Sequence, residues 1–76
     1  MVRKWLVDLR KEKGLTCREL GERIGVSEVY MFNLEHGTRC AKGMKVSHIC
    51  KIAEATGSLA IDLLQAEIDW TKEARE

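Results

Sequence analysis

Residues 16–37, with the sequence TCRELGERIGVSEVYMFNLEHG, contain two short helical patterns separated by a glycine. The first pattern opens with the capping-box spacing, in which the Thr16 hydroxyl accepts a hydrogen bond from the Glu19 amide and the Glu19 carboxylate accepts one from the Thr16 amide. Gly25 closes this pattern, because glycine adopts a left-handed backbone without a Cβ penalty. The stretch therefore predicts a helix of barely two turns that ends at Gly25.

A second helix follows almost at once. Ser27 is a favourable N-cap residue, and Gly37 lies where a helix that begins near Glu28 would stop. The third helix of the chain is therefore expected over residues 28–36, and together with its predecessor it has the layout of a helix-turn-helix unit.

Apolar residues at three- and four-residue intervals predict further helices on both sides of this unit. One precedes it, over residues 2–13, and ends at Gly14. A fourth helix ends at Gly57, and a fifth begins after Ser58. The apolar positions that define these three helices are Val2, Trp5, Leu6 and Leu9, then Val46, Ile49, Ile52 and Ala53, and finally Leu59, Ile61, Leu63 and Leu64.

Length and composition favour one small all-helical domain. The 76 residues include no Pro, and only two Trp, one Tyr and one Phe, so aliphatic side chains must fill the core. We expect the domain to cover residues 1–65. Residues 66–76 then form a charged tail that either extends the last helix or contacts a second copy of the chain.

No segment has the pattern of a membrane span, a signal peptide or a metal site. The longest apolar run is far shorter than the roughly 18 residues of a spanning helix, and the N-terminus is charged at helical intervals. Cys17, Cys40 and Cys50 are odd in number and match neither a disulfide framework nor a C-x-x-C metal knuckle. We expect a soluble, cytoplasmic protein with reduced cysteines, no metal, no cofactor and no small-molecule ligand.

The charged residues are distributed unevenly along the chain. Residues 1–45 contain ten Lys and Arg against six Asp and Glu, and residues 46–76 contain three against six, so the two parts carry +4 and −3. This polarity suits a domain that presents its N-terminal half to a polyanion, although chance can produce it in so short a chain.

Residues 9–37, LRKEKGLTCRELGERIGVSEVYMFNLEHG, resemble the Cro and phage-repressor type of helix-turn-helix protein, the XRE family. The later IAEATGSLAIDLL resembles the closing helices of that family, so the likeness covers residues 5–64. It implies a compact five-helix lambda-repressor-like domain. It also implies a transcriptional regulator, a repressor, that binds a palindromic site in double-stranded DNA as a homodimer.

The resemblance further implies an internal ion pair between Arg10 and Glu35, with two unpaired surface charges as the alternative. Three features depart from the family. Cys17 replaces a common Gln that donates to a DNA phosphate, and a thiol is only a weak donor. Gly21 replaces a common Ala, at a cost of about 0.5–1 kcal/mol in helix propensity. The loop after the third helix is longer than usual and lacks a proline.

The third helix has two contrasting faces. Met31 and Leu34 form a core face, and the opposite face consists of Glu28, Val29, Phe32 and Asn33. In the major groove Asn binds adenine N6 and N7, a carboxylate accepts from cytosine N4, and apolar groups contact the thymine methyl. These four residues are therefore the candidate base-reading set. As alternatives, Glu28 is a first-turn residue favoured by the helix macrodipole, and Phe32 packs against the second helix or belongs to a protein interface.

Phosphate contacts are expected from helix starts and from a basic loop. Residues 38–45, TRCAKGMK, hold three cations without apolar periodicity, so we expect an exposed loop whose charges either bind phosphates or are simply solvated. The full set of phosphate candidates is Arg10, Thr16, Cys17, Ser27, Arg39, Lys42 and Lys45.

Other readings remain open at this point. Ile68 and Trp70, with Leu59, Leu63 and Leu64, offer a dimer interface, or alternatively Ile68 and Trp70 fold back on Trp5 and Leu6. The main functional alternative is a protein-interaction module of the same fold that has lost DNA binding. An enzyme is not expected, because His36 and His48 have no partners at catalytic spacing.

Overall fold

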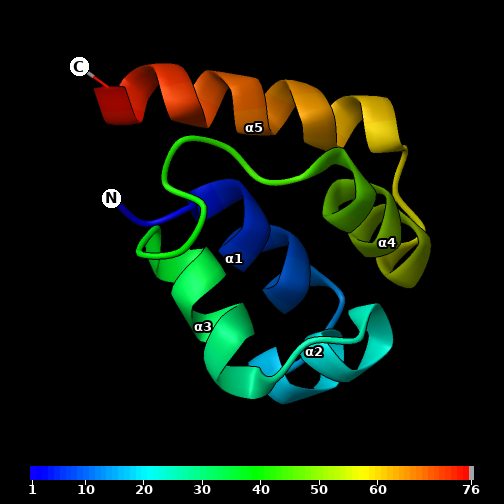
Figure 1. The fold of residues 1–76 in the computed structure, drawn as a ribbon. Helices are drawn as coiled ribbons and strands as arrows, with labels where there is room; N and C mark the ends of the chain where they lie inside the picture. Colours follow the sequence, from blue (N-terminus) through cyan, green and yellow to red (C-terminus); the bar gives the residue numbers. More distant parts are fainter. Residues whose placement is uncertain (76) are drawn as a thin grey trace.

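The computed structural model describes residues 1–75, which form five α-helices (Figure 1). The helices are α1 (Lys4–Glu12), α2 (Cys17–Ile24), α3 (Glu28–His36), α4 (Val46–Thr56) and α5 (Ala60–Arg75). The all-α class and the succession of five helices expected from the sequence are therefore confirmed.

Every helix contributes to one apolar core. The Cα radius of gyration is 11.1 Å, close to the roughly 11 Å of a compact domain of this length. Among residues 1–75, none of the helices is both long and apolar enough to cross a bilayer. The core side chains that are exposed by 1% or less are Leu6, Leu20, Met31, Leu34, Ile49 and Ile52.

The first helix begins later than predicted, at Lys4 instead of residue 2. The preceding residues run beside the end of α3, where the Arg3 amide donates to the Glu35 carbonyl at 2.6 Å. Val2 was expected in the apolar stripe of the first helix, but it lies outside α1 and is 46% exposed. The backbone of these residues is thus used for a contact with α3 and not for a helical turn.

The connection between α2 and α3 has the local geometry that its sequence predicts. Both halves of the capping box are present, with the Glu19 amide 3.1 Å from Thr16 Oγ1 and the Thr16 amide 3.0 Å from Glu19 Oε1. Gly25 ends α2 with a φ of 80°, and Ser27 Oγ accepts the Tyr30 amide at 3.0 Å. We refer to residues 25–27 as the turn.

Gly21 allows α2 to approach this turn closely. A Cβ atom at position 21 would lie 2.9 Å from the Val26 carbonyl oxygen and 3.3 Å from that of Ser27. Both neighbours are backbone atoms, which cannot move aside as a flexible side chain can. The position therefore requires glycine, and even alanine would displace the turn.

The last helix extends well beyond the predicted core segment and crosses the expected boundary between residues 1–65 and 66–76. Trp70 is 5% exposed, and its Nε1 donates to the Val2 carbonyl at 2.9 Å. Trp70 thus folds back on the N-terminus, as one alternative proposed, where it contacts Val2 and Arg3. Ile68, in contrast, remains 40% exposed. Position 76 of the expected tail lies outside the described residues.

Candidate nucleic-acid interface

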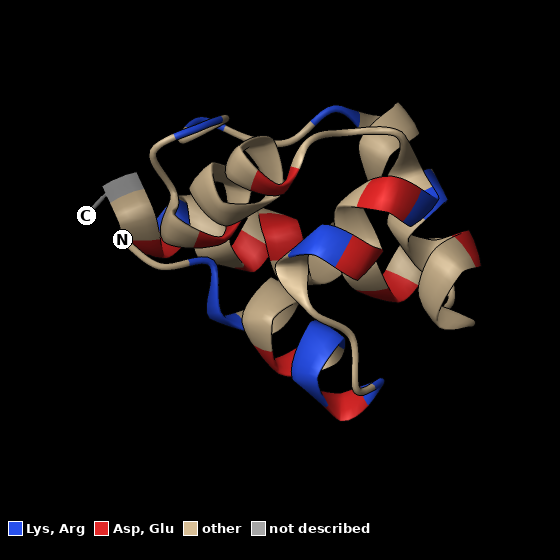
Figure 2. Cartoon of the chain, turned by 90° about the horizontal axis from the view of Figure 1, so that it is seen from below, with Lys and Arg blue, Asp and Glu red and all other residues tan. Residues whose placement is uncertain are grey.

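Seen from below (Figure 2), the chain does not divide into a basic and an acidic half. Figure 2 shows Lys and Arg interleaved with Asp and Glu over the view from below. One reason is that a cation of the basic half, Arg3, is buried in a pair with an acid of the acidic half, Glu67. A nucleic-acid surface must therefore be sought in local groups of residues.

Helix α3 is divided into two faces as the sequence predicts. Met31 and Leu34 are fully buried, whereas Val29 is 68% exposed and Phe32 51% exposed. Glu28 is also exposed, at the start of the helix. Three of the four candidate base-reading residues thus project outward from a helix whose opposite face is fixed in the core.

Phe32, for which packing against α2 was one of the expected environments, is half-exposed and contacts a residue of its own helix. Its ring lies 4.0 Å from the ring of His36, centroid to centroid, with the two planes tilted by 35°. His36 lies four residues further along the same helix and is exposed. The two rings therefore form a small aromatic surface on the outer side of α3.

Asn33, the fourth candidate, is partly buried beside the end of α3. Its backbone carbonyl accepts the amides of Thr38 and Arg39 at 3.1 and 3.2 Å and so begins the loop that follows. Among the residues that the structure describes, its side-chain amide has no hydrogen-bond partner. That group is thus available to an external ligand.

Arg10 and Glu35 form the predicted ion pair between α1 and α3. Arg10 Nε lies 2.5 Å from Glu35 Oε2, and Nη2 lies 3.1 Å from Oε1. The hydrogen bond with Glu35 raises the pKa of Arg10 above its ordinary value. Arg10 Nη1 donates to the Leu15 carbonyl at 2.8 Å. These bonds hold the guanidinium within the protein and leave the side chain only 14% exposed, so Arg10 is a structural residue and not the phosphate contact that was expected.

Thr16 and Ser27 are exposed at the starts of α2 and α3. Each hydroxyl oxygen accepts a backbone amide, which leaves its own hydrogen free to donate outward. Cys17 lies beside Thr16 and is only partly exposed. Burial raises the pKa of the Cys17 thiol, and Glu35 adds to the rise. Cys17 is therefore a neutral thiol and a weaker phosphate donor than the two hydroxyls.

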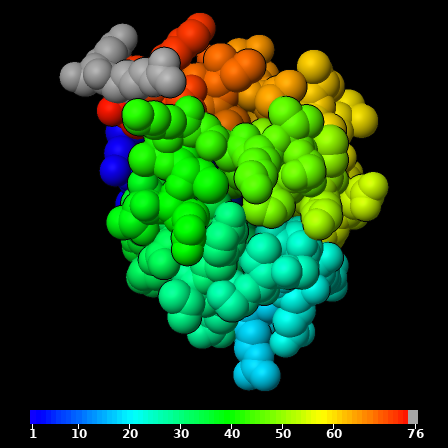
Figure 3. All heavy atoms as spheres, in the orientation of Figure 1, coloured from blue at the N-terminus to red at the C-terminus, as the bar shows by residue number. Residues whose placement is uncertain are grey.

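The loop cations Arg39, Lys42 and Lys45 are exposed, as expected. The Arg39 guanidinium lies 4.8 Å from the centre of the Tyr30 ring, a cation–π contact that directs it along α3. Figure 3 shows α3, the loop and α4 side by side on one face of the molecule. Met44 departs from the expected exposed loop, since the residue is only 7% exposed.

Tyr30 and His48, which the sequence did not single out for this surface, connect α3 to α4. Their rings meet edge to face, with centroids 5.8 Å apart. His48 Nδ1 is buried and has no hydrogen-bond partner among the described residues. Burial, helped by Lys51 and Lys45, lowers the pKa of His48, so the ring is neutral near pH 7. The spacing of the aromatic residues is the one sequence feature that could have suggested this contact. The contact itself forms only when α3 and α4 pack together.

Comparisons with known proteins return no relative: no family model, curated protein or solved structure matches the chain. An inference about function must therefore rest on the structure itself. The relevant features are the outer face of α3, the capped starts of α2 and α3, and the cationic loop beside them.

Proposed function

We propose that the chain is a cytoplasmic transcriptional regulator, a repressor, that binds double-stranded DNA with α3 in the major groove. The observation that carries this proposal is the outward face of α3, with Val29 and Phe32 exposed while Met31 and Leu34 anchor the helix in the core. A major groove about 12 Å wide admits one helix, and the short turn before α3 leaves its first residues unobstructed.

The groups that surround α3 support phosphate binding on both sides of the groove. The hydroxyl hydrogens of Thr16 and Ser27 are free at two helix N-termini, where the helix dipole favours an anion. Arg39 and Lys45 lie at the two ends of the loop that follows α3. Such contacts supply most of the affinity for DNA and make it salt-dependent.

The side chains on α3 supply chemistry that base edges can accept. Asn33 has an unused amide for adenine, and Glu28 can accept from cytosine N4. Val29 and Phe32 can contact thymine methyl groups. We therefore propose that sequence choice depends on these four residues and phosphate affinity on the hydroxyls and loop cations.

One domain of this size covers only a few base pairs, so we propose that specificity requires a homodimer on a palindromic site. Each copy would have the lambda-repressor-like fold. Leu63 and Trp70 are buried within the protein, so they are not available to a second copy. The large apolar residues left exposed on and beside the described part of α5 are Leu59, Ile61 and Ile68. We propose that these three face the second copy.

The proposal is tested by fluorescence anisotropy with random-sequence duplex DNA over a series of salt concentrations, followed by selection of bound sequences from a random pool. We expect binding that weakens steeply with salt and a selected half-site. Asn33→Ala should relax choice at one base pair by about 1–3 kcal/mol, whereas Gln65→Ala, which removes an amide from the exposed side of α5, should not. Absence of binding even at low salt would refute the proposal.

A second function is favoured by one observation, the exposure of Phe32 beside His36 on the outer face of α3. Aromatic residues are enriched at protein interfaces, and a domain of this type can bind a partner protein with the same face. In that case Phe32→Ala abolishes partner binding, while the chain shows no salt-dependent affinity for random duplex DNA.

A further inference from the structure

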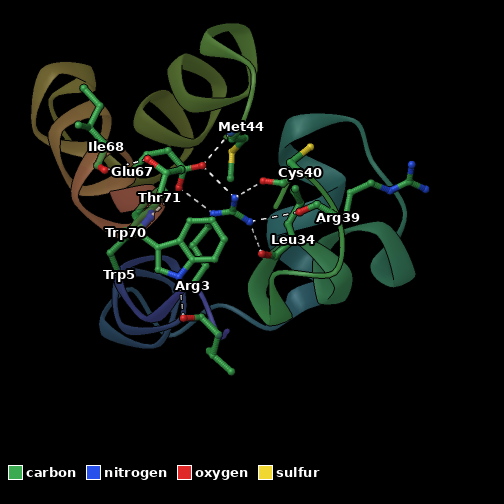
Figure 4. Close-up of polar contacts among 11 residues, drawn as sticks. Arg3, Trp5, Leu34, Arg39, Cys40, Met44, Glu67, Ile68, Trp70 and Thr71 are labelled. Atoms are coloured by element: carbon green, nitrogen blue, oxygen red, sulfur yellow. Dashed lines mark hydrogen bonds and ion pairs between the residues drawn. The ribbon is translucent and has the colours of Figure 1, made fainter. Parts of the chain in front are cut away.

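A buried ion pair joins the N-terminus to α5, 64 residues away (Figure 4). Arg3 is 0% exposed and Glu67 is 3% exposed. The pair is bidentate, with Arg3 Nε 2.7 Å from Glu67 Oε1 and Nη2 2.8 Å from Oε2. The guanidinium also lies 4.0 Å from the centre of the Trp70 ring. Arg3 is thus held between two residues of α5.

The remaining donors of Arg3 bind backbone carbonyls at the end of α3 and in the loop. Nη1 donates to Leu34 at 2.5 Å and to Arg39 at 3.4 Å, and Nη2 donates to Cys40 at 2.7 Å. With the two bonds to Glu67, the five N–H groups of the guanidinium are all used. A single side chain therefore connects the N-terminus, α3, the loop and α5.

Glu67 holds the other end of the same loop. Its Oε2 accepts the Met44 amide at 2.7 Å, and its Oε1 accepts Trp5 Nε1 at 3.1 Å. Figure 4 shows the Arg3 and Glu67 side chains between α5 and the loop, with bonds to the loop on both sides. The pair thus fixes the loop backbone near its beginning and again one residue before Lys45.

The loop has few bonds of its own that could replace these. Between residues 40 and 44, the one local backbone bond recorded among the described residues joins the Gly43 amide to the Cys40 carbonyl at 3.0 Å. Cys40 has a φ of 57°, a left-handed conformation that non-glycine residues seldom adopt. The bond from Arg3 to the Cys40 carbonyl holds the residue in this conformation.

The need to fill the core does not explain why this position holds an ion pair and not two apolar side chains. Apolar side chains of similar volume often stabilise a fold as well as a buried ion pair does, but they cannot bind backbone carbonyls or an amide. We infer that Arg3 and Glu67 are positioning residues, which set the loop 38–45 so that Arg39 and Lys45 meet DNA phosphates. This inference rests on the proposed DNA-binding function and adds to it residues that do not touch DNA.

The expected consequence for binding follows from conformational entropy. A loop that is already fixed in the free protein loses little freedom when it binds, whereas a loose loop must be ordered at that moment. Releasing the five residues 40–44 should therefore weaken DNA binding by about tenfold or more even when the rest of the domain stays folded.

The test replaces the pair by apolar side chains, Arg3→Met with Glu67→Leu, in the full chain. The matched control, Lys4→Gln with Asp8→Asn, removes one cation and one anion from an exposed pair in α1. We expect faster amide exchange at Met44 than in the parent protein, unchanged exchange in α2 and α4, and about tenfold weaker binding to random duplex DNA. The control should match the parent in both measurements.

Binding is measured well below the melting temperature of each variant, so that a purely structural role would leave the affinity of the folded protein unchanged. If the double variant does not fold, Arg3→Leu with Glu67→Met serves instead, since it also removes both charges at once and leaves neither partner buried without the other. Unaltered Met44 exchange, or faster exchange with parental affinity, would overturn the positioning role alone. Failure of the parent protein to bind duplex DNA would overturn the proposed function and, with it, this inference.

Discussion

Two connections flank α3, and they are held in opposite ways. The turn, residues 25–27, is fixed by neighbours in sequence: Gly25 ends α2, the Val26 amide donates to the Gly21 carbonyl at 2.8 Å, and Ser27 caps α3. The loop, residues 38–45, is bound to α3 at its start, where the Asn33 carbonyl accepts two amides. Further along, it is held by Arg3 and Glu67, which approach it from the two ends of the chain.

This difference decides how each connection responds to change. The turn depends on local steric and capping terms, each of which contributes on the order of 1 kcal/mol. The loop depends on one buried charge pair, in which the loss of either partner leaves an unpaired charge in the core. The start of α3 is therefore set by several small effects, and the path after α3 is set by one large effect.

The largest expected effect follows from breaking the charge pair on one side only. Arg3→Ala leaves the Glu67 carboxylate buried without its cation and should lower the free energy of unfolding by about 3–5 kcal/mol. Urea denaturation followed by circular dichroism measures this loss. Lys4→Ala, at an exposed neighbouring position, should change the stability by less than about 0.5 kcal/mol. Equal effects of the two substitutions would contradict the role given to Arg3.

The next effect concerns the turn. Gly21→Ala adds a Cβ atom 2.9 Å from the Val26 carbonyl oxygen. Overpacking costs about 1–3 kcal/mol, and the gain in helix propensity returns about 0.5–1 kcal/mol. We expect a net loss of about 1–2 kcal/mol in urea denaturation. Glu22→Ala, on the exposed side of α2, is the control and should be close to neutral. A more stable Gly21→Ala protein would show that the turn yields to the methyl group.

The turn could be predicted from the sequence, whereas the buried charge pair could not. The capping box at Thr16 and the glycine at position 25 act within a few residues, so their spacing alone predicted α2 and the start of α3. Periodicity also predicted the two faces of α3 correctly: Met31 and Leu34 are buried, and Val29 is exposed. Local rules were thus sufficient for the turn and for the division of α3.

Arg3 and Glu67 were not predicted, for a physical reason. Charged residues at the N-terminus and in the last helix have the pattern of solvated groups, and burial becomes favourable only when both partners and the loop backbone meet. The same limit concealed the burial of Met44. The continuation of α5 past residue 65 was one of the two alternatives expected for the tail. The Arg10 and Glu35 pair was expected because of a family resemblance, not because of local spacing.

A smaller effect is expected at the first residue of α3. Ser27→Ala removes the oxygen that accepts the Tyr30 amide and should cost about 1 kcal/mol, within a range of about 0.5–2 kcal/mol. Thermal denaturation measures the change. Ser47→Ala is the matched control, because Ser47 is exposed within α4, where alanine is a better helix former. A loss at Ser47 as large as that at Ser27 would mean that the cap does not distinguish the turn from other helix surfaces.

The smallest expected effect concerns the contact between α3 and α4. His48 meets Tyr30 of α3 edge to face, and burial, with Lys51 and Lys45, lowers its pKa below the ordinary value of 6.5. The unfolded chain therefore binds a proton at His48 more tightly than the folded chain does, and stability must fall as the pH falls through about 6.5.

We expect this decline in melting temperature between about pH 7.5 and 5.5, above the range in which carboxylates titrate. His48→Gln should remove the contribution of His48, and Lys51→Gln should weaken it by removing one nearby cation. If the decline is the same in all three proteins, His48 is not the group that titrates. In that case the contact between α3 and α4 is insensitive to protonation.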